Sequence, residues 1–223
     1  MGEVYRARDT RLDRDVAIKV FPAHLTRSPE FKQRFECEVK SISQLSHPNI
    51  CALHDVGHHD GTDYLVMELL EGETLAQRLT KGALPLEQVL KVGGEIASAL
   101  DAAHRKGVVH RDLKPGNVMF TKAGAKLLDF GLAKSSGVMD SDPSAVTVSH
   151  PLTSKGTILG TFQYMAPEQL EGAEADARTD IFAFGAVLYE TATGKRTFEG
   201  ASRASLIASI MSSQPRPINE LRR

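Results

Sequence analysis

The hydrophobic pattern of the chain changes once, near residues 70–72, and this change limits the folds that the chain can adopt. Before it, alternating stretches such as residues 15–20 are typical of strands, and residues 31–45 carry the single helical pattern. Three segments with helical periodicity follow it, at residues 86–106, 181–191 and 205–212. This order predicts an α+β fold of two lobes: a small β-rich lobe with one helix (residues 1–70) and a larger, mainly helical lobe (residues 71–223).

The composition is that of an ordinary globular domain. Hydrophobic residues make up 41% of the 223 residues, charged residues 25%, and the net charge is −1. This balance predicts no affinity for nucleic acid, and no apolar run approaches the roughly 18 residues of a membrane span. The two cysteines, Cys37 and Cys51, are not spaced as a C-x-x-C pair, which favours a reducing compartment. We therefore expect a cytoplasmic chain without a membrane segment.

The most informative stretch is residues 110–117, His-Arg-Asp-Leu-Lys-Pro-Gly-Asn. Three further motifs accompany it in the sequence: Val-Ala-Ile-Lys at 16–19, Asp-Phe-Gly at 129–131 and Ala-Pro-Glu at 166–168. Taken singly, a lysine on a strand is usually a solvated charge and an aspartate before glycine is usually a turn residue. Four such motifs in this order are the protein-kinase signature. From residue 2 to about 216, the chain resembles the catalytic domain of eukaryotic-like (Hanks-type) bacterial serine/threonine protein kinases.

The resemblance implies catalytic roles for several of these residues. Asp112 is expected to orient the substrate hydroxyl and accept its proton, and Lys114 to neutralise the transferred phosphoryl group. Thr161 is expected to bond both of them. Lys19 is expected to hold the ATP phosphates, with the Glu38 carboxylate holding Lys19 in place. Glu36, two residues before Glu38, is the alternative partner of Lys19.

The resemblance also implies sites for nucleotide and metal. Asn117 and Asp129 carry hard oxygen ligands, which suit Mg²⁺ beside phosphates, with Mn²⁺ as the alternative ion. Asp180 is expected to hold the backbone of the 110–117 loop through hydrogen bonds. The residues expected to contact ATP are Gly2, Val4, Ala17, Lys19, Met67, Glu68, Leu70 and Met119.

The function implied is transfer of the γ-phosphoryl group of ATP to serine or threonine hydroxyls of protein substrates. Arg111 beside the expected base suggests control by autophosphorylation of the following loop, since phosphate pairs well with arginine. Thr153 is the first choice for the phosphorylated residue, with Ser154 and Thr157 as alternatives. A homodimer that phosphorylates itself in trans is a further expectation, and so is a parent protein anchored in a membrane through a segment outside this chain.

Both ends of the sequence look trimmed relative to the family pattern. Gly2, Glu3 and Val4 match the last third of a phosphate-binding glycine loop, and the first strand with its two glycines is missing. At the other end, no arginine can be named as the partner that the family pattern gives to Glu168. The alternative function is therefore a catalytically impaired nucleotide-binding or scaffolding module of the same fold.

Overall fold

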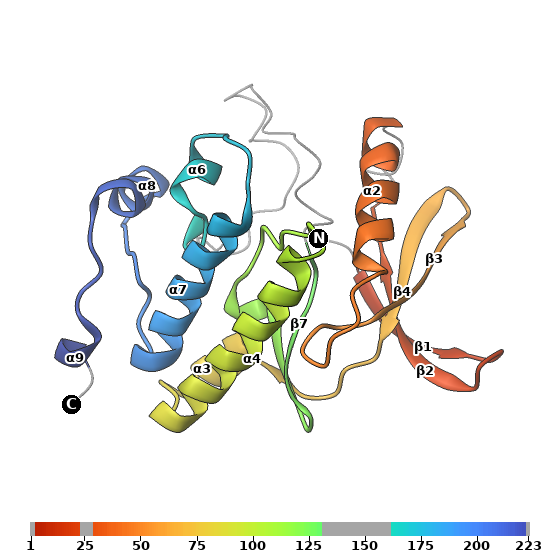
Figure 1. Cartoon of the computed structure of the whole chain (residues 1–223), viewed down its shortest axis with the longest axis horizontal. Helices are drawn as coiled ribbons and strands as arrows, with labels where there is room; N and C mark the ends of the chain where they lie inside the picture. The colour runs from red at the N-terminus through yellow and green to blue at the C-terminus, as the bar shows by residue number, and fades with distance from the viewer. Residues whose placement is uncertain (1–2, 23–28, 131–161, 222–223) are drawn as a thin grey trace.

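A computed structural model describes residues 3–22, 29–130 and 162–221 of the chain. Figure 1 shows a sheet with a single helix at one end of the molecule and a group of helices at the other. The expected α+β fold with a β-rich start and a helical body is confirmed. The division at residue 70 stays a prediction, although the segment between the fourth and fifth strands, residues 69–72, lies where the hydrophobic pattern changes.

The first sheet is antiparallel, with strand order β1-β2-β4-β3. Its strands are β1 (Glu3–Asp9), β2 (Arg14–Val20), β3 (Leu53–His59) and β4 (Thr62–Glu68). Helix α2 (Pro29–Ile42) packs beside the sheet (Figure 1), and its side chains Phe35 and Val39 are buried in the core. The helical spacing of these apolar residues is therefore explained by one buried face.

The second part of the chain contains most of the helices among the described residues. The longest are α4 (Leu86–His104), α7 (Ala177–Thr193) and α8 (Arg203–Ser212). The shorter ones are α3 (Leu75–Leu79), α6 (Pro167–Leu170) and α9 (Ile218–Leu221). The 3₁₀ turn η1 (Pro115–Asn117) precedes a small sheet, β5-β6-β7, made of β5 (Glu73–Thr74), β6 (Val118–Thr121) and β7 (Gly124–Leu127).

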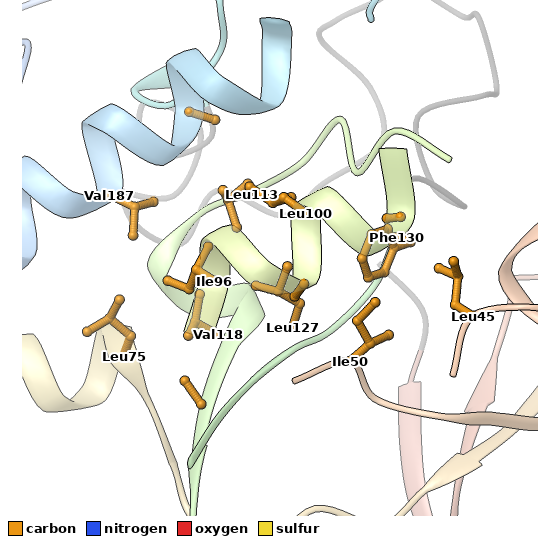
Figure 2. Close-up of a cluster of buried hydrophobic side chains, with 14 of the residues drawn as sticks. Leu45, Ile50, Leu75, Ile96, Leu100, Leu113, Val118, Leu127, Phe130 and Val187 are labelled. Carbon is orange, nitrogen blue, oxygen red and sulfur yellow. The ribbon is translucent and has the colours of Figure 1, made fainter. Parts of the chain in front are cut away.

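One hydrophobic cluster joins the two parts. It extends from Phe35 of α2 through Ile96 of α4 to Val187 of α7. In Figure 2, Ile50 lies beside Leu127 and Phe130. Backbone bonds reinforce this junction, because the amide of Leu127 donates to the carbonyl of residue 49 and the carbonyl of Leu127 accepts from the amide of residue 51. The segment that leads into β3 is thus tied directly to β7.

The helices predicted from periodicity are confirmed, with shifted ends. The segment predicted as a helix over 86–106 ends at His104, and the one predicted over 181–191 begins earlier, because Asp176 caps α7 by accepting from the amide of Arg178. The hydrophobic pattern does not predict α3, α6, α9 or β5, each of which has five residues or fewer. Within the described ranges, no helix has both the length and the apolar character needed to cross a membrane.

Candidate active site

The 110–117 loop brings three of the expected catalytic and metal-binding side chains together. Lys114 donates from Nζ to Oδ2 of Asp112 at 2.6 Å, and Asn117 donates from Nδ2 to the same oxygen at 3.1 Å. Asn117 also donates to the backbone carbonyl of Asp112 at 2.8 Å. Lys114 and Asp112 are largely shielded, with side-chain exposures of 14% and 18%. The carboxylate is therefore held in one orientation by a cation and an amide.

Asp180 fixes the start of this loop, as expected from the sequence. Its side chain is buried and accepts from the backbone amides of His110 at 2.7 Å and Arg111 at 2.8 Å. The His104 ring nitrogen Nε2 lies 2.7 Å from the same carboxylate. Arg111 has a positive φ of 63°, which is unfavourable for a residue other than glycine, and these bonds stabilise it.

Two further contacts of the loop could not be foreseen from the sequence. Gln169, which follows Glu168, donates from Nε2 to the backbone carbonyl of Arg111 at 2.9 Å, so α6 is attached to the loop. The His110 ring is completely buried, lies 2.9 Å from the carbonyl of Leu128 and packs against Phe130 at 4.7 Å between ring centroids. Burial lowers the pKa of His110 below its usual value, although the nearby Asp180 and Asp112 charges act in the opposite direction. The buried His110 ring therefore supports the 110–117 loop by packing, on the side of the hydrophobic core.

The β6–β7 hairpin brings the two expected metal ligands to the same end. Asn117 immediately precedes β6 and Asp129 follows β7, and the backbone amide of Leu128 donates to the carbonyl of Asn117 at 2.9 Å. Because the Asn117 amide nitrogen is used by Asp112, its Oδ1 remains the atom that can coordinate a cation. A carboxylate and an amide oxygen are a donor set that suits Mg²⁺.

The expected ion pair between Lys19 and Glu38 is not the arrangement found. Among the described residues, Lys19 instead pairs with Asp129, with 2.6 Å between Nζ and Oδ1. Glu38 accepts from Nη1 of Arg111 at 2.9 Å. Glu36, the alternative partner, is exposed. The physical reason is that α2 presents Glu38 to the 110–117 loop, where the Arg111 guanidinium meets it, while buried Lys19 meets the carboxylate at the end of β7.

The side chains expected around adenine lie on adjoining strands. Ala17 of β2 is the direct cross-strand partner of Met67 of β4, and Val4 of β1 is the partner of Lys19. Met119 lies in the other sheet, on β6. Val4 and Ala17 thus come from one sheet and Met119 from the other, and their contact with opposite faces of an adenine ring stays a prediction.

Glu68, which is expected to contact ATP, bonds to other residues of the chain through both its backbone and its side chain. The Glu68 amide donates to the carbonyl of Ala52 at 2.9 Å, and Lys126 Nζ lies 2.8 Å from both carboxylate oxygens. Cys51 lies against the Glu68 carbonyl, at 3.6 Å from its Sγ. Burial raises the pKa of Cys51 to about 12, with a further contribution from the Glu68 charge.

Glu168, for which the sequence names no arginine partner, makes a hydrogen bond with a hydroxyl group. Its Oε1 accepts from the hydroxyl of Thr179 at 2.7 Å, so the half-buried carboxylate has a hydrogen-bond partner within the described chain. The short side chain of Thr179 reaches Glu168 because Thr179 lies in the first turn of α7, next to α6. Gly2, Thr161 and the candidate phosphorylation sites Thr153, Ser154 and Thr157 lie outside the described residues.

Comparison of the chain with known proteins identifies relatives of similar sequence. The protein kinase domain family matches residues 1–220. The chain is 38% identical over 223 residues to the serine/threonine-protein kinase PknB of Mycobacterium leprae, covering 97% of this chain and 34% of that protein. It is 39% identical over 225 residues to PknA of Mycobacterium tuberculosis, covering 98% of this chain and 50% of that protein. It thus spans half or less of the length of these curated relatives.

A solved structure gives the same result for the fold. The crystal structure of the Mycobacterium tuberculosis PknI kinase domain superposes with a TM-score of 0.74 at 29% sequence identity, covering 100% of this chain and 76% of that one. The similarity includes both sheets and the helical part, since the whole of this chain is matched. The chain therefore belongs to the protein kinase domain family.

Proposed function

We propose that the chain is the catalytic domain of a serine/threonine protein kinase, transferring the γ-phosphoryl group of ATP to serine or threonine hydroxyls of protein substrates. The observation that carries this proposal is the convergence of Lys114 and Asn117 on one oxygen of Asp112, at 2.6 and 3.1 Å. The relatives PknB and PknA are both named serine/threonine-protein kinases, which supports serine and threonine as the residues that receive the phosphoryl group.

The residues of the site support a defined division of labour. Asp112 accepts the proton of the substrate hydroxyl. The oxygen of that hydroxyl forms a bond to the γ-phosphorus, and the bond between the γ-phosphorus and the bridging oxygen breaks, so that ADP leaves. Lys114, next to Asp112, offsets the negative charge of the transferred group. Lys19, which is only 7% exposed, supplies an ammonium group for the phosphates.

Asn117 Oδ1 and the Asp129 carboxylate are the atoms of this chain suited to hold Mg²⁺, since each is a hard oxygen donor at the same end of the β6–β7 hairpin. When bound, Mg²⁺ neutralises charge that develops on the phosphoryl oxygens. Lys19 Nζ lies 2.6 Å from Asp129 in the structure, so Lys19 would give up this contact if Asp129 held Mg²⁺, and its ammonium group would then be available to the phosphates.

Regulation by phosphorylation of the 131–161 segment is part of the proposal. Arg111 contacts Glu38 at 2.9 Å, and its side chain is 34% exposed. A phosphate on Thr153, Ser154 or Thr157 that bound Arg111 would compete with Glu38 for the guanidinium and release Glu38 toward Lys19. Phosphopeptide mapping after incubation with ATP tests this proposal: phosphate on one of the three residues supports it, and an unmodified segment in an active sample contradicts it.

A second candidate is a nucleotide-binding or scaffolding module that transfers no phosphate. The observation that favours it is the pairing of Glu38 with Arg111 while Lys19 pairs with Asp129. The two candidates are separated by incubating the chain with γ-labelled ATP and Mg²⁺, with Asp112→Asn as the matched control, followed by phosphoamino-acid analysis. Label on serine or threonine of the wild-type chain alone supports the kinase. Bound nucleotide without transfer, in a folded chain, supports the module.

A further inference from the structure

A second hydrophobic cluster, separate from the main one, holds helix α8 against α6 and α7. Its buried members are Phe198, Leu206 and Ile210, and the partly buried side chains packed against it are Phe162, Leu170 and Phe182. The rings of Phe182 and Phe198 are stacked, with 5.8 Å between their centroids. Figure 1 shows α8 beside α6, at the end of the molecule opposite the first sheet. The apolar face of α8 therefore fixes the helix in place, and its first residue with it.

Arg203, the first residue of α8, places its guanidinium over the ring of Phe162. The guanidinium carbon lies 4.3 Å from the ring centroid, within the range of a cation–π contact. Arg203 is exposed, and within the part of the chain that the structure describes no carboxylate forms an ion pair with it. The contact with Phe162 is thus the interaction that the structure shows for this cation.

The position of Arg203 does not serve the helix itself. The N-terminus of a helix carries partial positive charge, so a cation in the first turn is unfavourable there. Ser202 already caps α8, because its side chain accepts from the amide of Ser205 at 3.1 Å. An arginine at this position is therefore better explained by its contact with Phe162 than by the stability of α8.

Phe162 begins a short segment, residues 162–166, that leads to α6 and borders the candidate active site. The carbonyl of Phe162 accepts from the amide of Met165 at 3.2 Å, which closes a turn. Tyr164, within this turn, lines a cavity of about 350 Å³ together with Lys114. The position of the Phe162 ring therefore affects one wall of the cavity beside Lys114.

This cavity lies where a protein substrate is needed. Lys114 bonds to Asp112, so the cavity adjoins the carboxylate that is proposed to act as the base. Its lining does not include Lys19 or Asp129, the residues proposed to serve the phosphates and the metal. Residues that flank the substrate hydroxyl can thus lie in the cavity while ATP lies elsewhere. A displaced wall would weaken the binding of the protein substrate and not that of ATP.

We propose that Arg203 is a positioning residue for the protein substrate. It acts through the ring of Phe162, which it holds so that the turn at residues 162–165 stays against the cavity beside Lys114. The inference rests on the proposed kinase function. Loss of the guanidinium weakens the binding of the protein substrate and leaves ATP binding and the transfer step unchanged, because the contact of Arg203 is with Phe162 and not with the groups around the phosphates.

The test measures steady-state transfer of label from γ-labelled ATP with Mg²⁺ to a degenerate nonapeptide mixture that has a single central serine. The KM for the peptide, the KM for ATP and kcat are determined for the wild-type chain and its variants. For Arg203→Gln, we expect the KM for the peptide to rise about two- to fivefold, which a cation–π contact at an exposed site accounts for. The KM for ATP and kcat should stay unchanged.

Two further variants test the charge. Arg203→Lys keeps a cation over the ring and should restore most of the loss. Arg105→Gln is the matched control, because it removes the same group from the end of α4, where the arginine side chain is 77% exposed. Its kinetic constants should equal those of the wild-type chain.

A double-mutant cycle separates this role from a general effect of charge. Phe162→Leu removes the aromatic face and keeps an apolar side chain for the second cluster. In that background, Arg203→Gln should change the KM for the peptide by less than about twofold, since the ring through which Arg203 acts is gone. If Arg203→Gln fails to fold by circular dichroism, Phe162→Leu alone tests the contact from its other side, with the same expected rise.

The outcomes separate this inference from the proposed function. An unchanged KM for the peptide in a folded Arg203→Gln variant would overturn the inference and leave the proposed function standing. An equal rise in the presence and absence of the Phe162 ring would also overturn it, and so would a fall in kcat with a rise in both KM values, which indicates a merely structural role. No transfer by the folded wild-type chain would overturn the proposed function, and the inference with it.

Discussion

At the scale of single residues, Asp180 shows how a buried carboxylate can shape a site without entering its chemistry. It is fully buried, and both backbone amides that it accepts from belong to the 110–117 loop. Asp180→Ala would leave these two amides without an acceptor, at about 1–3 kcal/mol each. We expect the free energy of unfolding, measured with urea, to fall by about 2–5 kcal/mol. Asp101→Ala, on an exposed pair with Arg105, is the control and should cost less than about 1 kcal/mol. Equal losses in the two variants would contradict this role.

The two cysteines differ in their environment, and this difference predicts their reactivity. Burial raises the pKa of Cys51 to about 12, so its thiol stays protonated at pH 8, whereas Cys37 is exposed on α2. We expect iodoacetamide at pH 8 to label Cys37 and leave Cys51 unmodified, as measured by mass spectrometry of peptides. In urea, both should react. As pH rises toward 12, labelling of Cys51 should increase, because the reactive thiolate then forms. Equal labelling of the two cysteines in the folded chain at pH 8 would show that Cys51 is not shielded.

At the scale of elements, α4 contains a glycine pair whose two members have different surroundings. A Cβ on Gly93 would meet Leu188 of α7 at 3.0 Å, so this glycine allows the two helices to approach. Gly94 is exposed and a Cβ there would meet nothing within 4 Å. Gly94→Ala should therefore stabilise the fold by up to about 1 kcal/mol through helix propensity. Gly93→Ala should gain less, because Leu188 must move. Thermal unfolding of the two variants measures this difference, and a larger gain for Gly93→Ala would contradict it.

The sequence predicts the long elements and misses the short ones for a physical reason. In α4, the apolar residues Val89, Val92 and Ile96 repeat over several turns and all are buried, so periodicity identified the helix. α6 has four residues and β5 has two, which is too short for any period to be visible. These elements depend on tertiary contacts instead, such as the bond from Gln169 to the carbonyl of Arg111.

In the candidate site, contacts between residues close together in the sequence can be predicted, and contacts between distant residues cannot. Asp112, Lys114 and Asn117 lie within six residues of one another, so a single loop conformation brings them together. The predicted partner of Glu38, Lys19, is wrong, because Glu38 pairs with Arg111 instead. Glu38 and Arg111 lie 73 residues apart and meet only through the placement of α2 against the loop. No local pattern encodes such a distance.

At the scale of the whole molecule, the fold gives two carboxylates of α2 different surroundings. Glu38 is partly buried and meets Arg111 of the 110–117 loop, while Glu36 is exposed. The segment that leads into β3 is also tied to β7 through the backbone of residues 49–51.

The central claim is that Asp112 acts as the base in phosphoryl transfer from ATP to a protein hydroxyl. The most direct measurement is the rate at which label from γ-labelled ATP with Mg²⁺ is transferred to protein serine or threonine, for the wild-type chain, Asp112→Asn and the control Asp101→Asn. General-base catalysis predicts a loss of about 10²–10⁴-fold for Asp112→Asn. Asp101, which is exposed on α4, should be dispensable. Unchanged transfer in a folded Asp112→Asn variant would contradict the account.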